Sequence, residues 1–308
     1  EFYSFKDHDL GIPNALIGTV RMLQELSYQF EIIDSKFDFE KYKLIILPDD
    51  IKFMSTLESK LLEYIKNGGK VIGTNKSLID DKNKDSSLYG ISYEGESEYY
   101  RDFILPNDVI GKDLYKEEYV MYLRGAKTKV NDAKVLMNSI EPYFNREGKT
   151  FCSHQHTPSS GKIGYPAATR KGNVIYFAHP IFKIYRKNCA RWCKSIIKDA
   201  IEMLLDHKLV NHNGPSTVIT AINRQADHNR DILHVLHYIT EKRSEDIYTI
   251  EDVIPLYNLE FKLYVGEKQV KAVKAVPELK SIDFTNTDGY IIFNVDKIEG
   301  HNMFSIEY

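Results

Sequence analysis

The sequence predicts a two-part protein: a doubly wound α/β domain with a mostly parallel sheet, followed by a small antiparallel β-sandwich. Two observations predict this order. Up to about residue 206, apolar runs of strand length alternate with apolar stripes at helical spacing, as in α/β proteins. From residue 217 the apolar residues recur at every second position, which is typical of short antiparallel strands. We therefore expect an α/β domain over residues 1–206, a linker over 207–216 and a β-sandwich over 217–308.

The first elements follow one another as strand, helix, strand and strand. The alternating aromatic residues of Glu1–Phe5 predict a strand entered partway along, which suggests a fragment of a longer protein. Apolar residues spaced by three and four after Pro13 predict a helix, and Tyr28–Ile33 alternates as a strand does. The nearly continuous apolar run Tyr42–Leu47 predicts a strand buried on both faces.

A second helix and strand then continue the pattern. Ser55, with Glu58 three residues later, is the signature of a capping box at the start of a helix. Lys70–Thr74 predicts the strand that follows this helix. Residues 80–171 carry no pattern that assigns their elements securely.

The α/β domain is expected to end with a strand and a long helix. Asn173–Ala178 predicts a buried strand, and residues 181–205 predict one helix with Cys189 and Cys193 on a shared face. Together with Cys152, these make an odd number of cysteines, which is not a disulfide framework. We therefore expect free thiols and a reducing, cytoplasmic setting.

Beyond the polar, Gly214-Pro215-containing linker, seven short strands are expected to form the β-sandwich. They are Thr217–Asn223, Ile232–Ile239, Asn258–Val265, Val270–Val276, Ser281–Phe284, Tyr290–Val295 and Met303–Ile306.

The composition excludes two classes of partner. The net charge is −3 with both signs mixed along the chain, whereas a nucleic-acid-binding protein usually concentrates basic residues on one face. No apolar run approaches the roughly 20 residues that span a bilayer, and no signal peptide opens the chain. We expect neither nucleic acid nor membrane as a partner.

Several segments, in this order, resemble one family. LGIPNALIGTVRMLQELSYQFEIID, YKLIILPDD, NGGKVIGTNKS and NVIYFAHPIF resemble the trimerisation domain of family-42-type β-galactosidases and related glycoside hydrolases. ILHVLHYITEKR and IEDVIPLYNLEFKL resemble the small β-sandwich that closes the same proteins. The resemblance implies a flavodoxin-like or class I glutamine-amidotransferase-like fold, a preceding catalytic barrel, and assembly into a homotrimer.

The resemblance also implies that catalysis lies outside this chain. Glycoside hydrolysis needs two carboxylates about 5–10 Å apart on a rigid frame, and in the relatives both come from the barrel. Such a barrel takes about 250 residues, which the two expected domains leave no room for. Asp49 and Asp50 are sequence neighbours whose side chains diverge in an extended segment, so they are a poor acid/base pair and more typical of a turn. We expect no catalytic residue and no cofactor in this chain.

The comparison with amidotransferases suggests a second kind of chemistry, which the sequence does not support. Those enzymes use a Cys on the turn after a strand and a His after a later strand. His179 stands at the end of such a strand, but the corresponding turn around Asn75 contains no Cys. The expected role of His179 is therefore a hydrogen bond to a loop or a helix end.

The loop FCSHQHTPSSG, residues 151–161, is the remaining candidate for a binding site. His154 and His156 are two apart, so an extended segment would place them on one side, and His179 would complete a three-nitrogen set. The sequence does not show that they meet, and we expect no metal site. A carbohydrate or interface contact, or an ordinary loop, are the alternatives.

Two functions remain in view. The first is a non-catalytic assembly region of a glycoside-hydrolase-like protein, with copies of itself and the parent's catalytic barrel as partners. The second is an independent hydrolase or a small-ligand or carbohydrate binder that uses strand-end residues. Its candidate contacts are Asp49, Asp50, Asn75, His154, His156 and His179.

Overall fold

The computed structural model describes residues 8–9, 12–245 and 247–308, so the strand predicted at Glu1–Phe5 lies outside the described residues. The chain divides into two compact units. The first unit combines the chain up to Met22 with Ile32–Asp206, and the second combines Leu23–Glu31 with His207–Tyr308.

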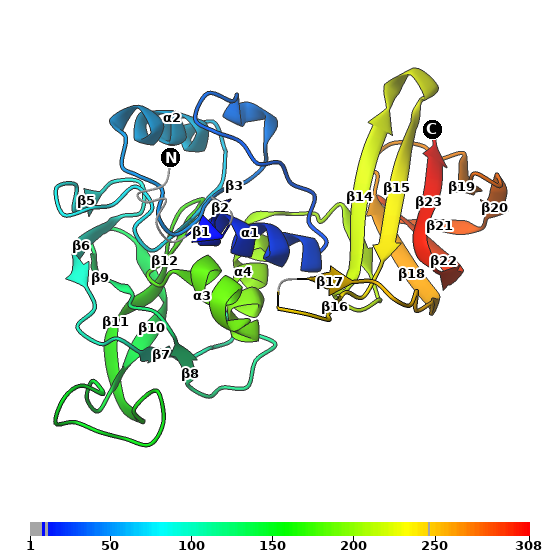
Figure 1. The fold of residues 1–308 in the computed structure, drawn as a ribbon. Coiled ribbons are helices and arrows are strands. Elements are labelled where there is room, and N and C mark those ends of the chain that lie inside the picture. Colours follow the sequence, from blue (N-terminus) through cyan, green and yellow to red (C-terminus); the bar gives the residue numbers. More distant parts are fainter. Residues whose placement is uncertain (1–7, 10–11, 246) are drawn as a thin grey trace. The chain divides into compact units, whose positions relative to one another are not determined.

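The predicted doubly wound, mostly parallel α/β fold is wrong. Strands account for 39% of the structure and helices for 18%, and the main sheet of the first unit is curled and mixed (Figure 1). Its seven strands lie in the order β3-β4-β12-β11-β10-β7-β8. They are β3 (Ile45–Leu47), β4 (Val71–Thr74), β7 (Asp102–Ile104), β8 (Tyr119–Met121), β10 (Lys134–Pro142), β11 (Ser159–Lys171) and β12 (Val174–Phe177).

Only one half of this sheet is parallel. The pairs β3–β4 and β4–β12 are parallel, whereas every pair from β12 outward to β8 is antiparallel. The strands that make the sheet mixed, β7, β8, β10 and β11, all lie within residues 80–171. The sequence pattern therefore identified the parallel half and missed the strands that change the fold class.

Three helices, most of a fourth (α1) and two smaller sheets complete the first unit. The small sheets pair β1 (His8–Asp9) with β2 (Ile12–Pro13), and β5 (Asp85–Ser86) with β6 (Ile91–Glu96) and β9 (Ala126–Val130). The helices are α1 (Asn14–Glu25), α2 (Ser55–Lys66), α3 (Ile181–Asn188) and α4 (Arg191–Leu204), with a 3₁₀ turn at Phe39–Lys41. α2 begins at the predicted residue, but its N-cap is Met54 and no side chain caps it, so the predicted capping box does not form.

The single helix predicted over residues 181–205 is interrupted. Cys189 adopts a left-handed backbone conformation with φ 49° between α3 and α4, and a continuous α-helix cannot contain such a residue. Cys189 is exposed there and Cys193 is buried in α4, so the two thiols do not share a helix face. All three cysteines are free.

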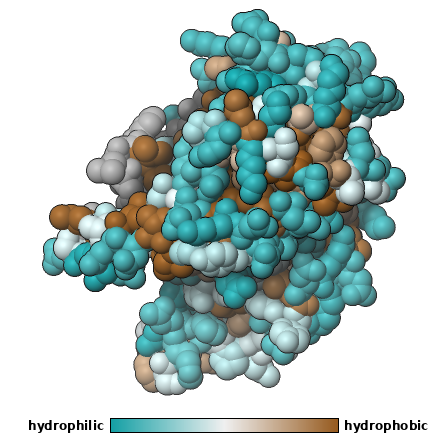
Figure 2. Space-filling model, turned by 90° about the vertical axis from the view of Figure 1, so that its right-hand side faces the viewer, coloured by the Kyte–Doolittle hydropathy of each residue, from teal (hydrophilic) through white to brown (hydrophobic). Residues whose placement is uncertain are grey.

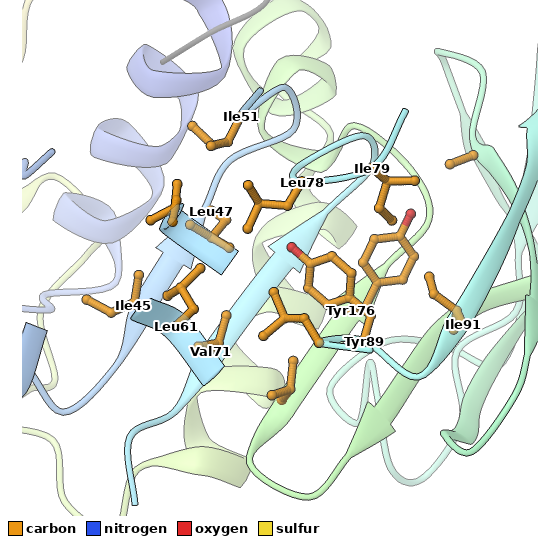
Figure 3. Close-up of a cluster of buried hydrophobic side chains, with 14 of the residues drawn as sticks. Ile45, Leu47, Ile51, Leu61, Val71, Leu78, Ile79, Tyr89, Ile91 and Tyr176 are labelled. Atoms are coloured by element: carbon orange, nitrogen blue, oxygen red, sulfur yellow. The ribbon is translucent and has the colours of Figure 1, made fainter. Parts of the chain in front are cut away.

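One buried hydrophobic cluster of the first unit lies between the parallel strands and α2 (Figure 3). Ile45, Leu61 and Val71 pack there, and the rings of Tyr89 and Tyr176 lie 4.7 Å apart by their centroids. A Cβ at Gly73 would stand 2.2 Å from Tyr89 Oη, so β4 needs a glycine for Tyr89 to lie across it.

The second unit contains two larger antiparallel sheets around one core. Their orders are β13-β18-β22-β21 and β14-β15-β23-β19-β20, and a short β16–β17 ladder accompanies them. Phe261, Phe293 and Phe304 pack together in this core. The strands are β13 (Val210–His212), β14 (Val218–Gln225), β15 (Arg230–His237), β16 (Glu241–Lys242), β17 (Tyr248–Thr249), β18 (Leu256–Tyr264), β19 (Ala272–Val276), β20 (Lys280–Ile282), β21 (Phe284–Thr287), β22 (Tyr290–Ile298) and β23 (Gly300–Glu307), with a 3₁₀ turn at Ala226–His228.

Tyr28–Ile33 is not the predicted strand. Its Gln29 side chain instead bonds to the backbone of β14, an edge strand. Gln29 Nε2 donates to Thr220 O at 3.1 Å, and Ile222 N donates to Gln29 Oε1 at 3.0 Å. One amide side chain thus supplies the two hydrogen bonds that a neighbouring strand would have made.

The surface is mostly hydrophilic, with hydrophobic residues gathered in patches on the face drawn in Figure 2. Within the described part of the chain, none of the helices is both long enough and apolar enough to cross a membrane.

Candidate functional site

Asp49 lies at the carboxyl end of β3 and is completely buried. Thr74 Oγ1 donates to Asp49 Oδ1 at 2.7 Å and accepts a bond of the same length from the Asp49 backbone N–H. Lys183 N, in the first turn of α3, donates to Asp49 Oδ2 at 2.7 Å. The carboxyl group therefore ties two parallel strands to the start of a helix.

Burial dominates the ionisation of Asp49 and raises its pKa to about 7. The neighbouring Asp50 raises it further, while the Thr74 hydroxyl and the Lys183 N–H favour the charged form and lower it. Asp50 itself forms an ion pair with Lys183 Nζ near the surface. Both acids thus contact Lys183, Asp49 through the backbone N–H and Asp50 through Nζ, and they do not form an acid/base pair.

Asn75 follows β4 in a left-handed conformation with φ 49°. Its Nδ2 donates to Ala178 O at 2.9 Å and its backbone N donates to Phe177 O at 2.7 Å. Tyr176 Oη donates to Asn75 O at 2.6 Å. Every one of these partners belongs to the end of β12, so the side chain and backbone of Asn75 lock two strand ends together.

His179 follows β12 and is buried against two residues of the antiparallel half of the sheet. Its Nε2 lies 2.7 Å from Asp102 Oδ1 in β7 and 3.1 Å from Tyr165 Oη in β11. Tyr165 Oη in turn donates to Asp102 Oδ2 at 2.5 Å. A Cβ at Gly125 would stand 2.1 Å from Tyr165 Oη, so a glycine is needed beside this network.

This buried network is built to hold strands together. Burial and the Asp102 carboxylate raise the pKa of Tyr165 well above its usual range. The phenol therefore stays protonated and donates a hydrogen bond to Asp102. Asp102 and His179 are each about 1% exposed, and both carboxylate oxygens of Asp102 already accept bonds. A general base must reach a substrate proton, and among the described residues the bonds of His179 Nε2 are to Asp102 and Tyr165.

A charged layer lies at the surface near these strand ends. Lys76 forms an ion pair with Glu96, and this bond, with the charges of Arg124 and Lys183, lowers the pKa of Glu96. Arg124 also lies 3.9 Å from Glu147. Because each cation here already has an acid beside it, the layer is not a strong anion site.

The histidine loop does not join the strand-end residues through any bond of the described chain. His154 Nδ1 contacts Ser153 Oγ at 3.1 Å, and the His156 ring packs edge-on against Phe103 at 6.0 Å between centroids. Cys152 Sγ bonds only to backbone carbonyls of the same loop. The described residues contain no group of three or more His, Cys, Asp or Glu side chains placed to hold a metal ion.

Sequence reasoning found Asp49, Asn75 and His179 but missed Thr74, Asp102 and Tyr165, which complete their contacts. Asp102 and Tyr165 lie in strands of the unassigned middle region, and nothing in the local sequence marks them as partners of His179. Thr74 could have been found, since it directly precedes Asn75 at a predicted strand end.

Comparison with known proteins shows what the chain is similar to. The family model described as the β-galactosidase trimerisation domain matches residues 20–180. No curated protein matches the chain. Among solved structures, α-L-fucosidase isoenzyme 2 from Paenibacillus thiaminolyticus has a TM-score of 0.91 and 32% identity, with 96% of this chain and 45% of that chain covered.

Two β-galactosidases share the fold at lower identity. A catalytic mutant of Gan42B, a GH42 β-galactosidase from G. stearothermophilus, gives a TM-score of 0.60 with 14% identity, over 99% of this chain and 38% of that one. The β-galactosidase from Bacillus circulans sp. alkalophilus gives 0.59 with 14% identity, over 97% and 38%. The chain thus spans less than half the length of each of these relatives.

Proposed function

Because the chain belongs to the family of β-galactosidase trimerisation domains and is an accessory region of the oligomerisation type, we propose that it assembles copies of a longer glycoside-hydrolase-like protein and shapes the active site of a neighbouring subunit. The observation that carries this proposal is that the polar side chains at the strand ends are already bonded within the chain. Asp49, Asn75 and His179 are buried and bonded to the chain's own groups. The surface of the first unit is what remains available for function.

The surface best suited to a subunit contact is the tip of the β10–β11 hairpin (Figure 1). We call residues 98–101 together with residues 143–158 the braced tip. Asn145 Nδ2 donates to Glu98 O at 2.8 Å, and Tyr100 N donates to Asn145 Oδ1 at 3.0 Å. Arg101 adds a bond to Gln155 O. These bonds connect the two segments, so the tip is ordered before any partner arrives.

The braced tip presents aromatic side chains to solvent. Tyr143 is 68% exposed and Phe151 is 73% exposed, with Arg146 lying 5.3 Å from the Phe151 ring. Tyr, Phe and Arg are enriched in protein interfaces. A preorganised aromatic projection supports docking onto a second copy, with each interface burying more than about 1,000 Å².

Sedimentation of the purified chain tests the assembly proposal. We expect a concentration-dependent oligomer, with three copies as the expected number, and a shift to monomer in the variant Tyr143→Asp/Phe151→Asp. Tyr115→Asp is the matched control, because Tyr115 is 82% exposed in the same unit and lies outside the braced tip. A monomer at high concentration, or equal loss of assembly in the control, contradicts the proposal.

We also propose that the parent protein acts on α-L-fucosides rather than β-galactosides. The support is the higher identity, 32% over 96% of this chain, with the α-L-fucosidase than with the β-galactosidases, which are at 14%. The full-length protein should hydrolyse a 4-nitrophenyl α-L-fucoside faster than the matching β-D-galactoside. The reverse preference contradicts this candidate without affecting the assembly proposal.

A reducing, cytoplasmic location is part of the same proposal. Its support is that Cys152, Cys189 and Cys193 are all free thiols, and free thiols persist where glutathione and thioredoxin keep cysteines reduced.

A further inference from the structure

One face of the five-stranded sheet in the second unit carries two neighbouring histidines. Leu233 and Val235 of β15 and Phe304 of β23 point into the core, so the residues between them point to the opposite face. His234 and His301 lie on that outer face, with His301 exposed and His234 half-buried. β15 and β23 are adjacent antiparallel strands (Figure 1).

The two imidazoles are close enough to share one ion. His234 Nδ1 lies 3.1 Å from His301 Nε2, and the rings are stacked with 5.3 Å between centroids. With an ion about 2.0–2.1 Å from both nitrogens, the N–metal–N angle would be about 100°, which lies between the square-planar and tetrahedral values. The rings need only turn so that both lone pairs face one side, and the exposure of His301 leaves room for this.

A third side chain with metal-binding chemistry stands beside the pair. Met303 is directly opposite His234 in the β15–β23 ladder and is two residues from His301 on the same face. Its thioether is a soft ligand, which favours Cu⁺ over hard cations. The ladder therefore places two imidazoles and a thioether on adjacent positions of one exposed face.

Asn223 of β14 can orient the first imidazole. Its amide nitrogen lies 3.3 Å from His234 Nε2. Turning this amide over places its oxygen where it accepts a hydrogen bond from Nε2–H of His234. That tautomer leaves Nδ1 free to bind an ion. Metal-bound histidines usually have an outer hydrogen-bond partner of this kind.

From this arrangement we propose that the outer face of the sheet holds a copper site, with His234 Nδ1 and His301 Nε2 as ligands and the Met303 thioether as a further ligand for Cu⁺. Imidazole ligands suit copper, zinc and nickel, and Cu²⁺ has the highest affinity of the divalent first-row ions. The thioether then distinguishes copper from the other two. The site is independent of the strand ends of the first unit and of the assembly proposal.

Titration of the whole chain with Cu²⁺, followed by isothermal calorimetry and electron paramagnetic resonance, tests the site. We expect one copper bound per chain, a spectrum with coupling to two imidazole nitrogens, and weaker binding of Zn²⁺. His301→Ala should weaken Cu²⁺ binding by more than about 100-fold, and Asn223→Ala by about 10-fold, as for loss of an outer-shell partner. The exposed His228→Ala is the matched control and should bind as the wild type does.

Cu⁺ supplies a second, independent arm. Met303→Leu conserves the volume of the side chain, so it should weaken Cu⁺ binding, measured against a chromogenic Cu⁺ chelator, and leave Ni²⁺ binding unchanged. Circular dichroism confirms that each variant is folded. Cu²⁺ binding that survives His301→Ala, or that is lost only in a His154→Ala/His156→Ala variant, overturns the proposal.

Discussion

Asp49 shows how a single buried acid can join three elements and still cost stability when it ionises. Its hydrogen bonds from Thr74 and Lys183 favour the carboxylate, but burial outweighs them and raises the pKa to about 7. The folded state thus holds a proton at pH values where the unfolded state, with a pKa near 3.8, has lost it. Stability therefore falls as the pH rises from about 4 to about 7.

Asp49→Asn removes this dependence, because an amide does not titrate. We expect the unfolding free energy of the wild type to decline relative to that of the variant across this pH window, by up to about 4 kcal/mol. Urea denaturation at several pH values measures the change, with Asp81→Asn, at an exposed position of the same unit, as the control for lost charge. Parallel pH profiles for wild type and Asp49→Asn would show that Asp49 is ionised throughout.

Position 125 requires a glycine because its backbone lies against the hydrogen-bond network of Tyr165 and His179. An alanine Cβ would approach Tyr165 Oη to 2.1 Å and His179 Cδ2 to 3.1 Å, so Gly125→Ala should destabilise the protein by about 1–3 kcal/mol, the usual cost of overpacking. Tyr165→Phe removes the closest atom, so the same change should cost less in that background. Equal costs in both backgrounds would show that the clash is not with the hydroxyl.

At the scale of elements, the Gln29 side chain makes the hydrogen bonds to β14 that a neighbouring strand would otherwise make. Gln29→Ala leaves Ile222 N–H and Thr220 O without their partner, which should cost about 1 kcal/mol and speed hydrogen exchange of the Ile222 amide. Gln29→Glu keeps the acceptor and loses the donor, so its Ile222 amide should remain more protected than in the alanine variant. Unchanged exchange in Gln29→Ala would mean that water replaces the side chain at no cost.

The elements that the sequence predicted well are those with one regular period. β3, β4 and β12 are short and almost wholly apolar, and α1 and α2 have clear stripes, so a local pattern was sufficient. β10 and β11 pair through a register that shifts repeatedly between Val135 and Pro142. Each shift reverses which face the next residue occupies, so the alternation that marks a strand is lost in the longest hairpin.

The candidate site was predictable only in part for the same reason. Asp49, Asn75 and His179 follow regular strands, so their positions at strand ends could be inferred from the sequence. Asp102 and Tyr165 come from the irregular half, and their meeting with His179 depends on how the sheet curls. A contact between residues 77 apart in sequence is a property of topology that no local pattern carries.

At the scale of the whole molecule, the question is whether this chain can hydrolyse a glycoside by itself. A hydrolase needs two carboxyl groups about 5–10 Å apart that both reach the sugar. The buried acids of the described chain are Asp49, Asp102 and Asp199. Asp49 and Asp102 are bonded as described above, and Asp199 Oδ2 accepts the backbone N–H groups of Gly111 and Lys112 at 2.7 and 2.9 Å. All three carboxyl groups therefore accept hydrogen bonds from donors within the chain.

We accordingly expect no turnover of 4-nitrophenyl α-L-fucoside or β-D-galactoside by the isolated chain, even at enzyme concentrations where the full-length parent is fully active. In the parent, His179→Gln should change stability and leave the pH dependence of kcat unaltered, because a positioning residue in a buried network does not exchange protons with substrate. Turnover by the chain alone that disappears in His179→Gln would instead assign catalysis to these strand ends. A parent whose pH profile shifts with His179→Gln would place the imidazole in contact with the reaction.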